Sequence, residues 1–187
     1  MRTAPTALAA ALLAALTLTA CSSGDGDGGG DDGKTSAAPA ESGKGAAACT
    51  AAKASFEIGP SSAAPAAGDE GAVPVTVTNK SGAACVLKGT ADVEMTVGER
   101  SWPVGAQQGV SKDTEVTVED GQAVSFAISY VRGVAGDAKK GATVDKLNFR
   151  LPGDSKVNSY DWPDPEIAFT SGGTLEAKVG PFLPVGD

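Results

Sequence analysis

The fold of this chain is decided by the stretch Val73-Pro-Val-Thr-Val-Thr-Asn-Lys-Ser-Gly-Ala-Ala-Cys-Val-Leu-Lys-Gly89. From residue 73 to 78, valine alternates with proline or threonine, a period of two that is typical of a strand with one buried face. Residues 79–82 favour a turn, because Asn and Gly tolerate positive φ and Ser bonds its own backbone. A second short strand follows, with Cys85 and Leu87 on one face. The stretch therefore predicts a β-hairpin.

Similar short alternating segments recur on both sides of this hairpin. They predict strands at residues 54–58, 93–97, 101–104, 116–118, 123–131, 146–151 and 174–179. Pro103 cannot donate a hydrogen bond to a neighbouring strand, so we expect residues 101–104 at the edge of a sheet. About nine strands, with no long amphipathic helical segment, predict an all-β, immunoglobulin-like sandwich over residues 49–187. A jelly roll or a barrel has the same strand pattern.

Residues 1–20 predict an export signal. A basic start, then an uncharged run rich in Ala and Leu, then small residues is typical of a secretory signal. The final residues Leu18-Thr19-Ala20-Cys21 resemble the bacterial lipoprotein box, which implies cleavage before Cys21 and acylation of that cysteine with fatty acids such as palmitate. Two acyl chains anchor a protein stably, so we expect Cys21 to hold the chain at the extracellular face of the bacterial cytoplasmic membrane. An uncleaved transmembrane anchor is the alternative, because the apolar run is near the shortest length that spans a bilayer.

Residues 21–48 predict a flexible tether rich in Gly, Ser and Asp. From residue 22 to 48 there is no aromatic or branched aliphatic side chain, so the segment cannot bury enough apolar surface to offset its ordering entropy. The aspartates between residues 25 and 32 do not have the spacing of a calcium-binding EF-hand loop. They are interpreted as part of a solvated acidic linker.

The composition excludes several classes of function. The chain has no histidine, so it cannot build a Ser-His or Cys-His nucleophile or an imidazole metal site. It contains neither Ser-x-x-Lys nor Gly-x-Ser-x-Gly, two motifs of catalytic serines. Its net charge of -8 repels the phosphates of nucleic acids. We therefore expect no enzyme activity, no cofactor and no nucleic-acid partner.

The three cysteines divide into one lipidation site and one pair. Once Cys21 is acylated, Cys49 and Cys85 are the thiols that remain, and an exported chain meets an oxidising compartment. They predict a structural disulfide that ties the first strand of the domain to the hairpin. A pair of free, inert thiols is the alternative.

Two groups of side chains are candidates for ligand binding. An aromatic platform for a sugar or a peptidoglycan fragment is predicted from Trp102, Tyr160 and Trp162, with Tyr130 as a further member. A weaker candidate site for calcium is predicted on a proline-rich loop from Asp161, Asp164 and Glu166. Tryptophans on a sandwich more often cap its core, and acidic loops on an acidic protein are usually only solvated.

The layout also resembles a known family. Cys49-Thr-Ala-Ala and the run from Val75 to Gly89 are similar to the actinobacterial secreted domain catalogued as domain of unknown function 4232, in which an Asn-x-[Ser/Thr]-Gly-x-x-Cys-x-Leu-x-Gly run follows an N-terminal cysteine. Residues 116–126 resemble its Leu-x-Pro-Gly-x-x-Ala strand pair, with Glu-Asp-Gly in place of the Pro-Gly turn. Members commonly carry further cysteines near the C-terminus, which this chain lacks. The resemblance implies an immunoglobulin-like sandwich on secreted or lipid-anchored proteins and implies no activity.

Together these expectations describe a lipid-anchored surface domain with a non-catalytic binding or structural role in the bacterial envelope. Its expected partners are the membrane, through the lipid on Cys21, and an envelope protein or polymer. The alternative is a module that binds carbohydrate or peptidoglycan fragments with exposed tryptophans.

Overall fold

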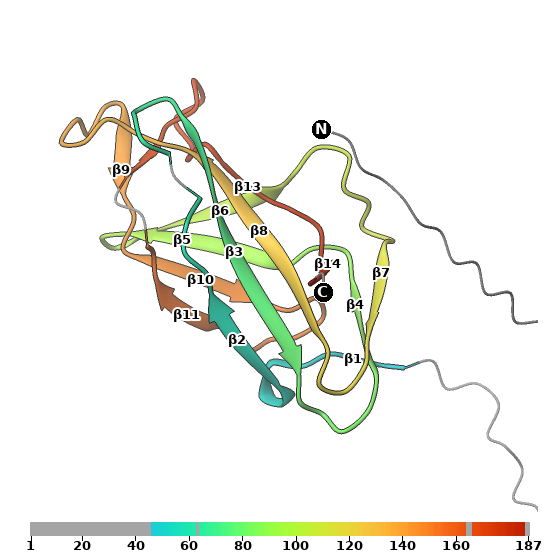
Figure 1. Ribbon diagram of the computed structural model, residues 1–187. Helices are drawn as coiled ribbons and strands as arrows, with labels where there is room; N and C mark the ends of the chain where they lie inside the picture. Colours follow the sequence, from blue (N-terminus) through green and yellow to red (C-terminus); the bar gives the residue numbers. More distant parts are fainter. Residues whose placement is uncertain (1–45, 63, 164–165, 186–187) are drawn as a thin grey trace, which may run out of the picture. The chain divides into compact units, whose positions relative to one another are not determined.

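The computed structural model describes residues 46–62, 64–163 and 166–185. These residues form strands and loops with one short 3-10 helix, so the prediction of an all-β fold is confirmed (Figure 1). The elements are β1 (Ala47–Ala48), η1 (Ala51–Lys53), β2 (Ala54–Ile58), β3 (Glu70–Asn79), β4 (Cys85–Lys88), β5 (Asp92–Val97), β6 (Arg100–Ala106), β7 (Glu115–Val118), β8 (Ala123–Val131), β9 (Gly141–Thr143), β10 (Lys146–Arg150), β11 (Asn158–Asp161), β12 (Glu166–Ala168), β13 (Ala177–Val179) and β14 (Leu183–Pro184). The predicted signal, Cys21 and the predicted tether up to residue 45 lie outside the described residues.

One long sheet runs through most of the domain. Its strand order is β11-β10-β5-β6-β13-β8-β3-β2, and β14 pairs with β8 beside this path. A three-stranded sheet with the order β1-β4-β7 and a two-stranded sheet of β12 and β9 accompany it. The ladder between β3 and β8 runs from the pair Glu70–Val131 to the pair Thr78–Ala123. In the described part of the chain, the structure contains no helix with the length and apolarity needed to cross a membrane.

The two halves of the long sheet share one core. Phe149 of β10 meets Phe126 of β8 edge to face, with ring centroids 5.6 Å apart. It also meets Phe56 of β2, with centroids 5.1 Å apart. β10 belongs to one half of the strand order, whereas β8 and β2 belong to the other. These contacts therefore join the halves face to face, as in a β-sandwich.

The predicted hairpin of residues 73–89 is wrong, although its strands are placed correctly. Val73, Val75 and Val77 are buried in β3, as their alternation predicted. However, β3 pairs with β2 and β8, whereas β4 pairs with β1 and β7 in the three-stranded sheet. Residues 80–84 carry the chain from one sheet to the other, and Gly82 takes a φ of 79° in this turn. Alternation fixes the face that a strand buries, but it does not fix the partner of that strand.

The predicted edge strand is also wrong. β6 pairs with β5 on one side and with β13 on the other. The ladder to β13 is confined to Gly105 and Ala106, whereas Pro103 lies opposite Glu94 of β5. Proline is tolerated because its position is paired on one side only.

Two predicted boundaries also move. Residues 47 and 48 form β1 beside β4, so the last two residues of the predicted tether belong to a strand. The predicted strand at residues 174–179 shortens to β13, and Leu175 makes an isolated bridge with Phe169 instead.

Candidate functional site

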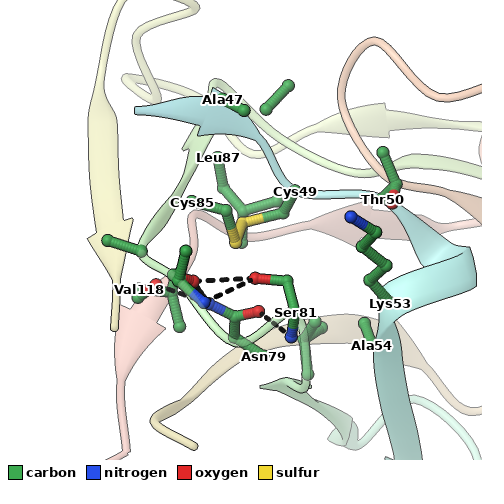
Figure 2. Close-up of a pocket in the computed structure, with 14 residues that line it drawn as sticks. Ala47, Cys49, Thr50, Lys53, Ala54, Asn79, Ser81, Cys85, Leu87 and Val118 are labelled. Atoms are coloured by element: carbon green, nitrogen blue, oxygen red, sulfur yellow. Dashed lines mark hydrogen bonds between the residues drawn. A yellow bond between two sulfur atoms is a disulfide. The ribbon is translucent and has the colours of Figure 1, made fainter. Parts of the chain in front are cut away.

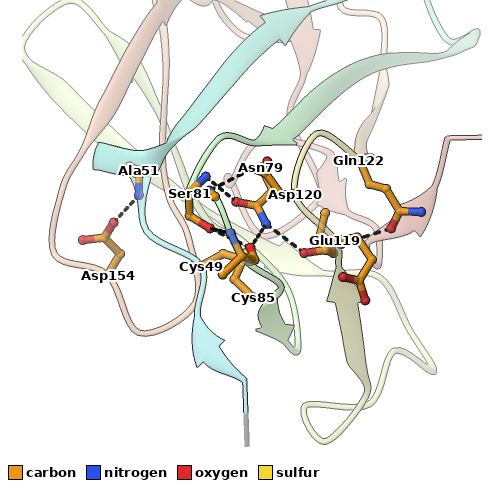
Figure 3. The surroundings of a disulfide bond; sticks show 12 residues. Cys49, Ala51, Asn79, Ser81, Cys85, Glu119, Asp120, Gln122 and Asp154 are labelled. Carbon is orange, nitrogen blue, oxygen red and sulfur yellow. Dashed lines mark hydrogen bonds between the residues drawn. A yellow bond between two sulfur atoms is a disulfide. The ribbon is translucent and has the colours of Figure 1, made fainter.

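A disulfide joins Cys49 and Cys85 (Figure 3). Both cysteines are buried, and the backbone N–H of Cys49 donates to the carbonyl oxygen of Val86 at 3.0 Å. The bond connects the residue that follows β1 with the first residue of β4, and these two strands run parallel. The predicted disulfide is confirmed, and it holds the entering chain against the three-stranded sheet.

The side-chain amide of Asn79 fixes the turn between β3 and β4 (Figure 3). Asn79 is only 2% exposed. Its Nδ2 donates to the carbonyl oxygens of Ala83 at 2.7 Å and Val118 at 2.8 Å, and its Oδ1 accepts from the N–H of Ser81 at 2.9 Å. Because Val118 ends β7, one side chain ties the turn to the three-stranded sheet.

Asp154 holds the short helix η1, next to the disulfide. Its carboxylate accepts from the backbone N–H of Ala51 at 2.7 Å and from that of Lys156 at 3.1 Å. The Ala51 N–H, and after it the Lys156 N–H, lowers the pKa of Asp154 below its ordinary value. The folded state therefore favours the charged carboxylate.

A hollow of about 270 Å³ lies beside the disulfide (Figure 2). Most of its lining is apolar and comes from side chains such as Ala54, Val77, Leu87 and Val118. Asn79 also lines the hollow, but its amide is already bonded within the turn. The hollow therefore offers an apolar shape without a polar group that needs a ligand.

A second cavity, of about 410 Å³, lies among β6, β9, β12 and the loop that precedes β9. We call it the Trp102–Glu166 cavity. Trp102 comes from β6, Glu166 from β12, and Phe169 follows β12 directly. The rings of Trp102 and Phe169 pack against each other, with centroids 5.8 Å apart and planes inclined by 46°. Arg100, Asp137 and Thr143 add polar groups to the wall.

Two glycines allow the elements around this cavity to approach closely. A Cβ atom at Gly141 would lie 3.0 Å from the Cα of Gly133 and 3.0 Å from the carbonyl oxygen of Ile167. In this tight arrangement β9 pairs with β12, which places Glu166 opposite Thr143. The close packing of these backbones therefore fixes the place of Glu166 on β12.

Two of the residues that line the Trp102–Glu166 cavity each have a buried polar atom with no partner among the described residues. These atoms are Nε1 of Trp102, a donor, and Oε2 of Glu166, an acceptor. A buried polar group without a hydrogen bond typically costs about 1–3 kcal/mol. Trp162 Nε1 is also buried without a partner in the described part, but Trp162 does not line this cavity.

A family model described as Domain of unknown function (DUF4232) matches residues 49–183. The chain belongs to this family. The match begins at Cys49 and ends at the first residue of β14, so the DUF4232 domain includes the disulfide, Asn79 and the Trp102–Glu166 cavity. No curated protein and no solved structure matched the chain.

The DUF4232 domain does not present the predicted aromatic platform. Trp162 is only 7% exposed and packs edge to face on Tyr130, with ring centroids 5.4 Å apart, so its predicted exposure is wrong. Tyr130 is buried as well, so its predicted place in an exposed platform is also wrong. Tyr160 is half-buried and stacks on Phe149 at 5.9 Å. Trp102 is half-buried on β6 and remains a candidate, with Phe169 as the ring partner that the sequence did not indicate.

The acidic residues of the calcium candidate have separate surroundings in the DUF4232 domain. Asp161 is exposed and forms an ion pair with Lys146. Glu166 lines the Trp102–Glu166 cavity, and Asp164 lies outside the described residues. Within the described ranges, the structure shows no group of three or more residues that could ligate a metal ion. Glu166 therefore contributes to the wall of that cavity.

Proposed function

We propose that this DUF4232 protein is anchored by a lipid on Cys21 at the extracellular face of the bacterial cytoplasmic membrane, where its domain binds an envelope protein or polymer without catalysing a reaction. The residues between Cys21 and the domain serve as a spacer. Binding takes place at the Trp102–Glu166 cavity.

The main support for the proposed location is the Cys49–Cys85 disulfide. Structural disulfides persist in oxidising compartments and are rare in the cytosol. This bond lies in the core, next to the point where the chain enters the domain. The disulfide therefore supports export of the chain. Acylation of Cys21, which the lipoprotein-like residues Leu18 to Cys21 imply, also requires export.

Binding is favoured over catalysis by the chemistry of the cavity. Its wall combines two aromatic rings with a few polar groups, a composition typical of ligand sites. The chain has no histidine to serve as the base of a nucleophile. Arg100, Asp137 and Thr143 on the wall can orient a ligand that packs against the two rings.

The location is tested with Cys21→Ala in intact cells, with Ser22→Ala as the neighbouring control. The unaltered protein and Ser22→Ala should enter the detergent phase after phase separation, and both should react with a membrane-impermeant label. Cys21→Ala should appear in the aqueous phase or accumulate as an unprocessed precursor, because the acylated thiol is lost. A Cys21→Ala variant that partitions like the unaltered protein would indicate a transmembrane anchor instead. Crosslinking on the same cells should recover a partner from the wall or membrane, and recovery of none would contradict the binding role.

A further inference from the structure

The hollow beside the Cys49–Cys85 disulfide has a lining that suits an aliphatic chain. Its apolar side chains include those of Ala54, Val77, Leu87 and Val118. Two polar side chains in the lining are already occupied: Asn79 bonds within its turn and to β7, and the Ser81 hydroxyl donates to the carbonyl oxygen of Ala83 at 2.7 Å. Burial of methylene groups is favourable in such surroundings, whereas a polar ligand group would lose its hydrogen bonds to water.

An unpaired cation borders this hollow. Lys53, the last residue of η1, is exposed, and among the described residues it is the one charged side chain in the lining. It forms no ion pair within the described part of the chain. Asp154 bonds the N–H of Ala51 in the same short helix, but it does not line the hollow. The ammonium group of Lys53 is therefore available to an anionic group of a ligand.

Thr50 lies beside Lys53 in the same turn. The N–H of Lys53 donates to the carbonyl oxygen of Thr50 at 3.0 Å, and this 3-10 geometry brings side chains three residues apart to the same side. Both residues line the hollow, and the Thr50 side chain caps no backbone group of η1 (Figure 2). A carboxylate fits this pair, because it accepts hydrogen bonds from an ammonium group and from a hydroxyl at once.

Volume and charge narrow the ligand further. The hollow has about 270 Å³, slightly less than the roughly 300–1,000 Å³ of pockets for drug-sized ligands, which favours one aliphatic chain over the two chains of a phospholipid. The chain as a whole has a net charge of -8. However, charges farther away than about 8–10 Å are largely screened at physiological ionic strength, and no described carboxylate lines the hollow. Lys53 therefore sets the local preference for an anion.

We propose that the hollow beside the disulfide binds a free fatty acid of medium chain length. The aliphatic chain packs among Ala54, Val77 and Leu87, and the carboxylate accepts hydrogen bonds from Lys53 Nζ and Thr50 Oγ1. The hollow shares no lining residue with the Trp102–Glu166 cavity. This inference therefore depends neither on binding at that cavity nor on a lipid at Cys21.

The test uses the full chain made by cell-free synthesis under oxidising conditions, because detergent would compete for an apolar site. Titration calorimetry below the aggregation concentrations of the probes should show saturable binding of decanoate. Decanoate should bind about tenfold more tightly than octanoate, because two more methylene groups are buried. Decanol, which lacks the charge, should bind about threefold more weakly than decanoate, and protonated decylamine about tenfold more weakly. Dioctanoyl phosphatidylglycerol, a two-chain lipid, should also bind more weakly than decanoate.

Two substitutions test the assigned contacts. Lys53→Glu reverses the charge and should reverse the order of affinities, so that decylamine binds more tightly than decanoate. Lys112→Glu, outside the hollow, should keep the original order. Ala54→Phe fills the hollow and should abolish binding of every probe, whereas Ala52→Phe, at an exposed position outside the lining, should not change it.

Unchanged melting temperatures would confirm that the variants fold. Because Lys53 is exposed, its charge reversal still decides the question if Ala54→Phe does not fold. No saturable binding of decanoate, tighter binding of the two-chain lipid, an unaltered order of affinities in Lys53→Glu, or equal affinity in folded Ala54→Phe would overturn the inference.

Discussion

Replacement of Asn79 by Ala should strongly lower the free energy of unfolding, because this side chain bonds both within its own turn and to β7. The substitution removes two donated hydrogen bonds, to Ala83 and Val118, and one accepted from Ser81. Each such bond contributes roughly 0.5–1.5 kcal/mol net, so the free energy of unfolding should fall by about 3 kcal/mol. Domains are typically stable by about 5–15 kcal/mol, which makes this loss a large fraction of the total.

Urea denaturation of the purified chain measures this loss. For a slope of about 1–3 kcal/mol per molar, the midpoint should fall by roughly 1–3 M. Asn148→Ala is the matched control, because its half-buried amide donates one hydrogen bond, to Thr96 Oγ1 at 2.9 Å. The control should lose about 1 kcal/mol. If Asn79→Ala were no less stable than Asn148→Ala, the amide of Asn79 would not hold the turn as argued.

Two further predictions concern the same end of the domain. The double variant Cys49→Ala/Cys85→Ala opens a loop of sequence separation 36, so chain entropy predicts a loss of about 3.8 kcal/mol and a fall in melting temperature on the order of 10 °C. Quantitative alkylation of both thiols in folded, non-reduced protein would refute the bond itself. Asp154 has a lowered pKa in the folded state, so its carboxylate adds stability above the ordinary carboxyl pKa and loses it as the pH falls through the lower folded value. Asp154→Asn should therefore be less stable than the unaltered chain at pH 7, with the difference shrinking towards pH 2; a difference independent of pH would contradict this account.

The sequence predicted strand positions well because side-chain alternation reports directly on burial. In β8, the residues that alternation places on one face, Val124, Phe126, Ile128 and Tyr130, are all buried. Strand pairing was not predictable in the same way. The turn after Asn79 suits a hairpin locally, but burial of Leu87 on the three-stranded sheet and of Val77 on the long sheet separates the two strands. That choice depends on contacts far apart in the sequence.

The candidate site was predicted in part. Trp102 was selected for its aromatic ring, and Glu166 was selected for calcium rather than as part of the cavity wall. Phe169 gave no signal, because β12 is only three residues long and shows no full period. The burial of Trp162 did have a signal: residues 158, 160 and 162 continue one period of two, in which Asn158 and Trp162 are buried and Tyr160 is half-buried. The neighbouring Asp161 and Pro163, both exposed, obscured that pattern.

The disulfide and the Trp102–Glu166 cavity belong to different ends of the domain. The chain enters through β1, which lies beside β4 and the disulfide, whereas β9 of the cavity wall lies at the opposite end (Figure 1). A lipid on Cys21 would pull on the first of these ends, where the Cys49–Cys85 bond transfers the force to the three-stranded sheet. Any attachment through the chain that enters at β1 would therefore act on the end of the domain that carries the Cys49–Cys85 disulfide, whereas the Trp102–Glu166 cavity belongs to the other end.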